Sequence, residues 1–138
     1  MYGSLDISVS GMIALRTRMD VISANLANQN ATRNAQGEIS PFRRRIAVFM
    51  PGDPTSSTKP GREKGVHVSE IMLDESPFQK RYDPHHPDAG EDGYVLTPNV
   101  NPAIEQVNAV ETARAYEANV AAAEATKTML AQALRLIG

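Results

Sequence analysis

Residues 101–138 read NPAIEQVNAVETARAYEANVAAAEATKTMLAQALRLIG, and this stretch decides the fold. It predicts a helix that begins at Pro102, where a missing N–H costs nothing, with the Asn101 side chain as its cap. Acidic residues come early in the stretch and Arg135 comes late, an order that suits the helix dipole. Such a helix would be about 50 Å long. No other part of so short a chain could cover that length, except the first helix in part.

The apolar residues of this helix fall on one heptad register, which only Lys127 interrupts. They are Ala113, Tyr116, Val120, Ala123, Leu130, Leu134 and Ile137. Such spacing puts them on one narrow stripe, typical of a coiled-coil seam. Lys127 has two interpretations. It is either a polar residue that sets the pairing register, or its aliphatic stem lies along the seam while its ammonium group extends into water. A second stripe consists of Ala115, Ala122, Met129, Ala133 and Leu136. It indicates either one wide amphipathic face or, the interpretation we favour, a helix packed among several subunits.

A matching seam lies near the start of the chain, and only Ser8 interrupts it. Its residues are Leu5, Met12, Leu15, Met19, Ile22 and Leu26. The pattern predicts a helix from about Ser4, as N-cap, to about Asn28, where asparagines favour an exit. Gly11 inside this helix indicates either a weak turn or the close approach of a neighbouring helix.

The middle of the chain contains all nine prolines, from Pro41 to Pro102, and cannot form long helices. We expect short strands near 46–50, 66–71, 78–82 and 94–96, and a mobile loop over 51–64. The predicted fold class is therefore mainly α with a small β-containing insert. Long N- and C-terminal helices would pack as a coiled coil beside a short-stranded middle domain. The expected division is 1–30, 31–101 and 102–138.

Composition argues against several classes of protein. The chain has 138 residues, a formal net charge of −2 and no cysteine, so it lacks thiolate ligands and the basic stripe of a nucleic-acid binder. Its first residues, MYGSLDISVSGMIAL, lack the basic and apolar regions of a secretory signal. No stretch approaches the roughly 18 apolar residues of a membrane span.

The sequence predicts no catalytic site, no metal and no cofactor. His85, His86 and Asp88, with Asp83 nearby, could be metal ligands, but prolines on either side favour a rigid turn that makes subunit contacts. No nucleophile with a base, no phosphate-binding glycine loop and no paired carboxylates are evident. The basic run at 43–45 indicates either a solvated strand edge or a contact with acidic neighbours.

Several motifs resemble the flagellar axial proteins, the rod and hook group. The stretch DVISANLAN at 20–28 is similar to their N-terminal signature, and ETARAYEAN at 111–119 resembles their C-terminal helix. The series YDPHHPDA at 82–89, GYV at 93–95 and PNVN at 98–101 resembles the proximal rod members in particular. The resemblance covers nearly the whole chain, except the loop at 51–64.

This resemblance implies a structural subunit of the flagellar proximal rod. Such proteins are exported unfolded by the flagellar type III apparatus, without a cleaved signal, and assemble in the periplasm. Their terminal helices form a tube around the export channel, and the rod transmits torque from the membrane ring to the hook. Expected partners are other proximal and distal rod proteins, the ring–rod junction protein, the membrane ring, the export apparatus and further copies of this chain.

The expected subunit contacts lie in the two seams and at the exit of the first helix. They are Leu5, Met12, Leu15, Met19, Ile22, Asn25, Leu26, Asn28, Tyr116, Val120, Leu130, Leu134 and Ile137. A further hypothesis is that both ends are frayed in the isolated chain and become helical on assembly. Two alternatives stay open: a cytoplasmic coiled-coil adaptor or secretion chaperone, and a small metal-dependent hydrolase that uses His85 and His86.

Overall fold

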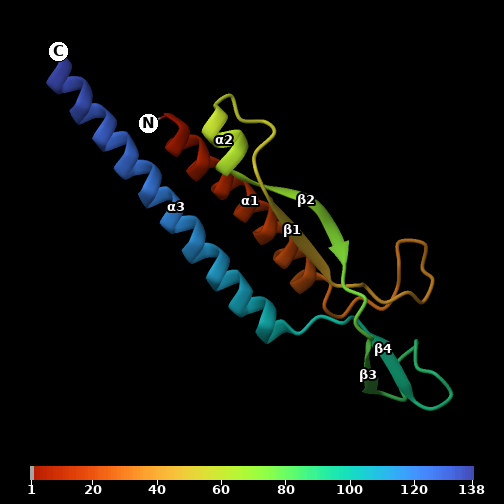
Figure 1. Ribbon diagram of the computed structural model, residues 1–138. Coiled ribbons are helices and arrows are strands. Elements are labelled where there is room, and N and C mark those ends of the chain that lie inside the picture. Colours follow the sequence, from red (N-terminus) through yellow and green to blue (C-terminus); the bar gives the residue numbers. More distant parts are fainter. Residues whose placement is uncertain (1) are drawn as a thin grey trace.

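Two long antiparallel helices dominate the computed structural model, which describes residues 2–138 (Figure 1). They are α1, Tyr2–Ala27, and α3, Pro102–Ile137. Between them come β1 (Arg45–Pro51), α2 (Lys59–Lys64), β2 (Val66–Leu73), β3 (Gln79–Tyr82) and β4 (Tyr94–Thr97). The predicted class, mainly helical with long terminal helices and a small β-containing middle, is confirmed. Coiled-coil packing of the long helices stays a prediction.

Helix α3 begins as the sequence predicts. Asn101 is its N-cap, and its Oδ1 accepts hydrogen bonds from the backbone N–H groups of Ala103 at 3.0 Å and Ile104 at 3.4 Å. These bonds satisfy two donors that have no partner inside the helix. The helix then continues without interruption for 36 residues.

Helix α1 begins earlier than predicted. It starts at Tyr2, so Ser4 lies in its first turn and the prediction of Ser4 as N-cap is wrong. The reason is tertiary: Gly3 is buried against Pro60 of α2, and this contact supports a turn that local signals do not mark. At the other end, Asn28 donates from its backbone and its side chain to the carbonyl oxygen of Ala24, at 3.1 and 2.9 Å. The predicted exit near Asn28 is confirmed.

All four predicted strands are present, in two separate two-stranded antiparallel sheets. The pairing of β1 with β2 runs from Arg45 opposite Leu73 to Pro51 opposite Val66, with a bulge after Val48. The pairing of β3 with β4 runs from Gln79–Thr97 to Tyr82–Tyr94. Because a two-stranded sheet is marginal alone, these strands depend on packing against the rest of the chain.

Helix α2 lies inside the segment 51–64, for which the sequence predicted a loop. That expectation is wrong for residues 59–64, and the mobility of the segment stays a prediction. Thr58 is the N-cap, and its Oγ1 accepts a hydrogen bond from the N–H of Gly61 at 3.2 Å. A threonine followed closely by Pro60 was the available signal for this short helix.

Helix α1 lies between α3 on one side and α2 with the β1–β2 sheet on the other (Figure 1). It supplies most of the buried apolar side chains, namely Ala14, Leu15, Val21 and Ile22. The β3–β4 sheet lies beyond the end of the helix pair. Within residues 2–138, no helix has both the length and the apolar character needed to cross a bilayer.

Candidate functional site

Helices α1 and α3 pair in a register that leaves the end of α3 uncovered. A Cβ on Gly11 would lie 2.9 Å from Oδ1 of Asn119, and Asn25 donates to Glu105 over 3.1 Å. In an antiparallel helix pair, the residue numbers of facing residues have a constant sum, which is 130 for both of these pairs. In this register, Tyr2 lies opposite residue 128. Residues 129–137 of α3 therefore extend past the start of α1, as Figure 1 shows. The contact also resolves the role of Gly11, which permits close approach of a neighbouring helix.

The face of α3 that meets α1 is polar along its centre. Glu105 and Thr112 are each 1% exposed, and Asn119 follows one heptad later. Thr112 Oγ1 donates to the carbonyl oxygen of Asn108 at 2.6 Å, and Asn119 Nδ2 donates to that of Ala115 at 2.9 Å. These side chains satisfy their own polar groups within the helix, so α1 can cover them without leaving a donor unpaired.

The predicted apolar stripes of α3 flank this polar line. At about 3.6 residues per turn, the Tyr116 stripe lies on one side of the line and the Met129 stripe on the other. Tyr116 is 40% exposed and Met129 is 57% exposed. Exposure rises along the uncovered end, where Leu134 is 62% and Ile137 is 85% exposed, whereas Val120 and Leu130 are half-buried. Heptad spacing of apolar residues does not reveal this polar line, because the contacts predicted on α3 all belong to the Tyr116 stripe.

The predicted N-terminal seam divides into two lines. Leu15 and Ile22 are buried, at 8% and 4% exposure. The remaining apolar members are half-buried and share heptad spacing; they are Leu5, Met12, Met19 and Leu26. This second line is the part of the seam that keeps accessible apolar surface.

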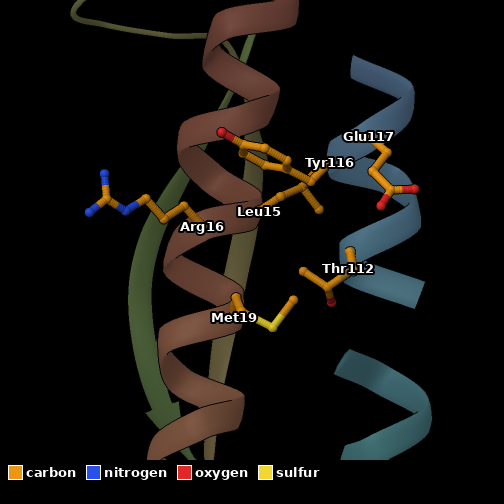
Figure 2. A pocket seen from close by; sticks show the side chains of 7 residues that line it. Leu15, Arg16, Met19, Thr112, Tyr116 and Glu117 are labelled. Carbon is orange, nitrogen blue, oxygen red and sulfur yellow. The ribbon is translucent and has the colours of Figure 1, made fainter. Parts of the chain in front are cut away.

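An open groove of about 380 Å³ lies between α1 and α3. Its apolar lining includes Leu15, Met19 and Tyr116, and Arg16 and Glu117 add charge to the lining. Figure 2 shows the Tyr116 ring reaching from α3 towards α1 beside Leu15, while Met19 points towards α3. The structure thus brings together three residues that the sequence predicted as subunit contacts, from helices about a hundred residues apart in the sequence.

At the other end of α1, Asn25 is not at a surface. It is 1% exposed, and its side chain exchanges two hydrogen bonds of 2.9 Å with the backbone N–H and C=O of Arg45. Its amide also donates to Glu105. The predicted role of Asn25 in subunit contacts stays a prediction, and in this structure its hydrogen bonds are made inside its own chain. Asn28 is half-buried at the helix exit.

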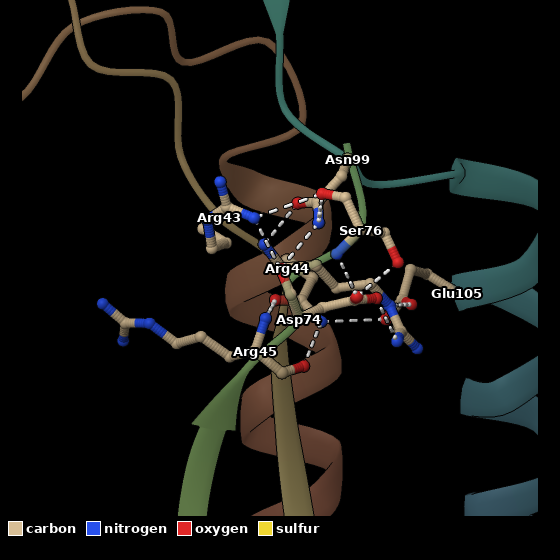
Figure 3. Close-up of polar contacts among 8 residues, drawn as sticks. Arg43, Arg44, Arg45, Asp74, Ser76, Asn99 and Glu105 are labelled. Atoms are coloured by element: carbon tan, nitrogen blue, oxygen red, sulfur yellow. Dashed lines mark hydrogen bonds and ion pairs between the residues drawn. The ribbon is translucent and has the colours of Figure 1, made fainter. Parts of the chain in front are cut away.

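Arg44 links its own segment to three others, which contain Asp74, Asn99 and Glu105 (Figure 3). Its Nε donates to Glu105 Oε1 at 2.6 Å, its Nη1 to Asp74 Oδ2 at 3.3 Å, and Asn99 Oδ1 accepts from its backbone N–H at 2.8 Å. Burial lowers the pKa of Arg44, but hydrogen bonds to the two carboxylates outweigh that effect and raise it overall. We call Asn25, Arg44, Asp74, Asn99 and Glu105 the hub.

The neighbouring arginines also bind within the chain. Arg43 Nη1 donates to the carbonyl oxygens of Asp74 and Ser76, at 2.9 and 3.1 Å, and its guanidinium lies 4.3 Å from the centre of the Phe78 ring. The interpretation of the basic run as a solvated edge is therefore wrong for Arg43 and Arg44, because distant partners in the fold occupy both. A contact of this run with acidic neighbours stays a prediction, and Arg45 is its exposed member.

The histidine-containing turn is fastened to the segment after α1. Asp88 accepts a hydrogen bond from Thr32 Oγ1 at 2.7 Å and forms an ion pair with Arg33. These contacts hold the pKa of Asp88 below its ordinary value, and the hydrogen bond from the Thr32 hydroxyl has the largest effect. His86 Nδ1 accepts from the Asp88 N–H at 3.0 Å. Across residues 2–138, no three acidic, histidine or cysteine side chains converge as metal ligands.

Comparisons with known proteins agree with the position of the two long helices. A family model described as flagella basal body rod protein matches residues 5–36, and one described as flagellar basal body rod FlgEFG protein C-terminal matches residues 91–136. The flagellar basal-body rod protein FlgC of Bacillus subtilis (strain 168) is 44% identical, over 98% of this chain and 97% of that protein. FlgC of Borreliella burgdorferi is 35% identical, over 99% and 97%. FlgC of Salmonella typhimurium is 32% identical, over 95% and 93%.

Proposed function

This chain belongs to the FlgC family of flagellar basal-body rod proteins and is a structural subunit of the rod, and we propose that its terminal helices build the proximal part of that rod. The family is structural and not a family of enzymes. The chain's place is the flagellar basal body, where it assembles with other components of that body.

The observation that carries the proposal is the apolar surface that α1 leaves uncovered on α3. Intrachain packing uses the polar line through Glu105 and Thr112, and the stripes on either side stay accessible. Leu136 is 88% exposed and Ile137 is 85% exposed in the single chain. Because burying each such side chain is worth about 2 kcal/mol, a neighbouring subunit that covers this end would gain several times that amount.

The groove between α1 and α3 supports the addition of a third helix. Leu15, Met19 and Tyr116 form its apolar lining, and Arg16 and Glu117 contribute charged groups beside it. An apolar centre beside charged groups is the arrangement that helix-in-groove contacts use. Heptad spacing of Met12, Met19 and Leu26 on α1 would let the added helix pack as in a coiled coil.

These surfaces suit an open-ended assembly. A contact between different faces of similar subunits generates a helical array instead of a closed dimer. In the rod, this array would form a tube around the export channel and transmit torque from the membrane ring to the hook. Its neighbours would be other proximal and distal rod proteins, the ring–rod junction protein, the membrane ring, the export apparatus and further copies. The chain would reach the periplasm through the type III apparatus, without a cleaved signal.

A charge on the uncovered end of α3 tests the proposal. Leu134→Glu removes an apolar side chain that is 62% exposed, so the isolated protein should keep its thermal unfolding midpoint. Cells with this variant should export it but form no complete rods and should not swim. Gln132→Glu adds the same charge on the opposite side of the same turn and should leave motility intact. Normal basal bodies with Leu134→Glu would show that the Leu134 stripe is not a subunit contact.

A further inference from the structure

One face of the β3–β4 sheet is apolar and accessible. Side chains of β4 alternate between the two faces, so that Val95 and Thr97 are buried on one of them. Tyr94 and Leu96 are exposed on the other. Tyr82 lies opposite Tyr94 on β3, and their ring centres are 5.2 Å apart in an edge-to-face arrangement. Adjoining exposed aromatic and aliphatic side chains of this kind mark an interaction surface.

The hairpin between α1 and β1 brings Ile39 to this face. A bridge between Arg33 and Ile39 closes the hairpin, and the ion pair of Arg33 with Asp88 fastens it to the turn between β3 and β4. Ile39 is 60% exposed and lines an open groove of about 300 Å³ together with Tyr94 and Leu96. Two segments that are far apart in the sequence therefore build the apolar lining of one groove.

The groove also has a charge of each sign in its lining. Asp92 and Lys80 both line it, and neither forms an ion pair with another residue of 2–138. The turn at 83–93 contains four acidic residues and no lysine or arginine. An occupant that fits the groove should therefore offer apolar side chains, a cation for Asp92 and an electronegative group for Lys80.

The uncovered end of α3 offers all three. Leu134 and Ile137 are exposed apolar side chains, and Arg135 lies between them in the sequence. Residues 125–138 contain two basic residues and no acidic one. The last carbonyl groups of a helix lack partners inside it and carry partial negative charge, which suits Lys80.

The exposed apolar side chains at the end of β2 fit this groove less well. Residues 71–73 are exposed, but Glu70 precedes them and Asp74 and Glu75 follow. These carboxylates would repel Asp92. Charge complementarity therefore selects the end of α3 as the occupant.

The dimensions of the two surfaces also agree. Residues 129–137 are nine helical residues and β3 and β4 have four residues each, so that both surfaces are about 13 Å long. The sheet and the end of α3 lie at opposite ends of the molecule, so one chain cannot join them itself (Figure 1).

We infer that the groove on the β3–β4 sheet receives the end of α3 from a second copy of this chain. This inference rests on the proposed rod function, for which it names the docking site of the uncovered helix end. The contact joins two different surfaces, so each bound copy keeps one groove or one helix end for the next. Such a head-to-tail contact extends into an open array.

Cysteine cross-linking in assembled basal bodies tests the docking. The chain has no cysteine, so Leu96→Cys and Ile137→Cys in one chain introduce the pair without a background from native thiols of this protein. A disulfide requires the two Cα atoms to lie within about 7 Å of each other. Oxidation of purified basal bodies should therefore give a ladder of multimers on a non-reducing gel. Chains with either cysteine alone should give no ladder.

Two further pairs are matched controls. Arg81→Cys replaces Leu96→Cys with a position on the other face of the sheet, and Gln132→Cys replaces Ile137→Cys. Neither control pair should give a ladder. Equal ladders in the controls would overturn the docking, and so would the absence of a ladder in basal bodies that contain the double variant. If the double variant does not enter basal bodies, the two substitutions on separate chains, expressed with the unaltered protein, should give a cross-linked dimer, and its absence would overturn the docking. Absence of the unaltered protein from basal bodies would instead contradict the rod function, and the docking with it.

Charge reversal tests the same contact without cysteines. Arg135→Glu brings a carboxylate to Asp92 and should lower the number of complete rods per cell about tenfold. Adding Asp92→Lys should recover most of that loss, because opposite charges face each other again. Adding Asp20→Lys, at an exposed carboxylate of α1, should recover none of it. A full number of rods with Arg135→Glu, or the same recovery with Asp92→Lys and Asp20→Lys, would overturn the docking.

Discussion

Arg44 donates from Nε to Oε1 of Glu105 over 2.6 Å, between residues 61 positions apart in the chain. Glu105 is 1% exposed, and its other carboxylate oxygen accepts from Asn25. The Glu105 carboxylate, in the first turn of α3, therefore binds both Asn25 near the end of α1 and Arg44 directly before β1. The hub sets how the helix pair meets the strands.

Removing this carboxylate should be costly. Glu105→Ala leaves Arg44 without its shortest ion-pair partner and removes one of the two acceptors of the Asn25 amide, so we expect the free energy of unfolding to fall by about 3 kcal/mol. Urea unfolding followed by circular dichroism measures this change. Glu111→Ala, at an exposed position of the same helix, should change it by less than about 0.5 kcal/mol. Similar values for the two variants would contradict a structural role for the hub.

Asn25 should matter for the attachment of β1. Asn25→Ala removes both hydrogen bonds to the Arg45 backbone and leaves those part-buried groups without these partners, at an expected cost of about 3 kcal/mol. Hydrogen exchange should locate the loss, because the Arg45 N–H loses its acceptor. Asn30→Ala, at an exposed position, is the control. Unchanged protection of the Arg45 amide in Asn25→Ala would count against this assignment.

Gly11 should tolerate no large side chain. Leucine favours helix, yet Gly11→Leu would force α3 away at Asn119 and should cost about 2 kcal/mol by overpacking. Asn119→Ala makes room and should recover part of that loss in the double variant. Thermal unfolding of the two single variants and the double variant gives the coupling. Additive effects would show that the two side chains do not meet.

Acid should weaken the hub through Asp74. Hydrogen bonds from the Ser76 side chain and backbone hold the pKa of Asp74 below its ordinary value, with a smaller contribution from Arg44. Because the folded pKa is the lower one, this stabilisation is present above the ordinary carboxyl pKa of about 4 and is lost as pH falls through the folded value. Ser76→Ala should therefore reduce the fall in unfolding free energy between about pH 5 and 2. An identical pH profile in Ser76→Ala would contradict this cause, and Ser57→Ala serves as the control.

Local patterns predicted the elements well. Alternation and turn residues located β1 to β4, and Asn101 followed by Pro102 located the start of α3 to the residue. Helix α2 was missed because only six residues form it, too few for a periodic signal. Serine is a preferred N-cap residue, which is why the sequence predicted Ser4 as the cap. The contact of Gly3 with Pro60 instead supports a helix that already begins at Tyr2.

The candidate site was predicted only in part. Leu15, Met19 and Tyr116, which heptad spacing assigned to the two seams, line one groove between α1 and α3. Their role as subunit contacts stays a prediction. It could not show that α3 would present Glu105 and Thr112 to α1. A buried carboxylate looks like a surface residue in the sequence, because its partner Arg44 lies far away in the chain.

The sequence by itself determined two long helices, four short strands and the family signatures, because these depend on neighbours within a few turns or along one strand. The tertiary structure alone decided which face of α3 packs against α1 and which apolar surface of α3 stays exposed. Asn25 and Glu105, 80 residues apart, meet only after the middle of the chain has folded. A polar group can be buried at low cost only where hydrogen-bond partners meet it. Those partners come from distant segments, so their position depends on the whole fold.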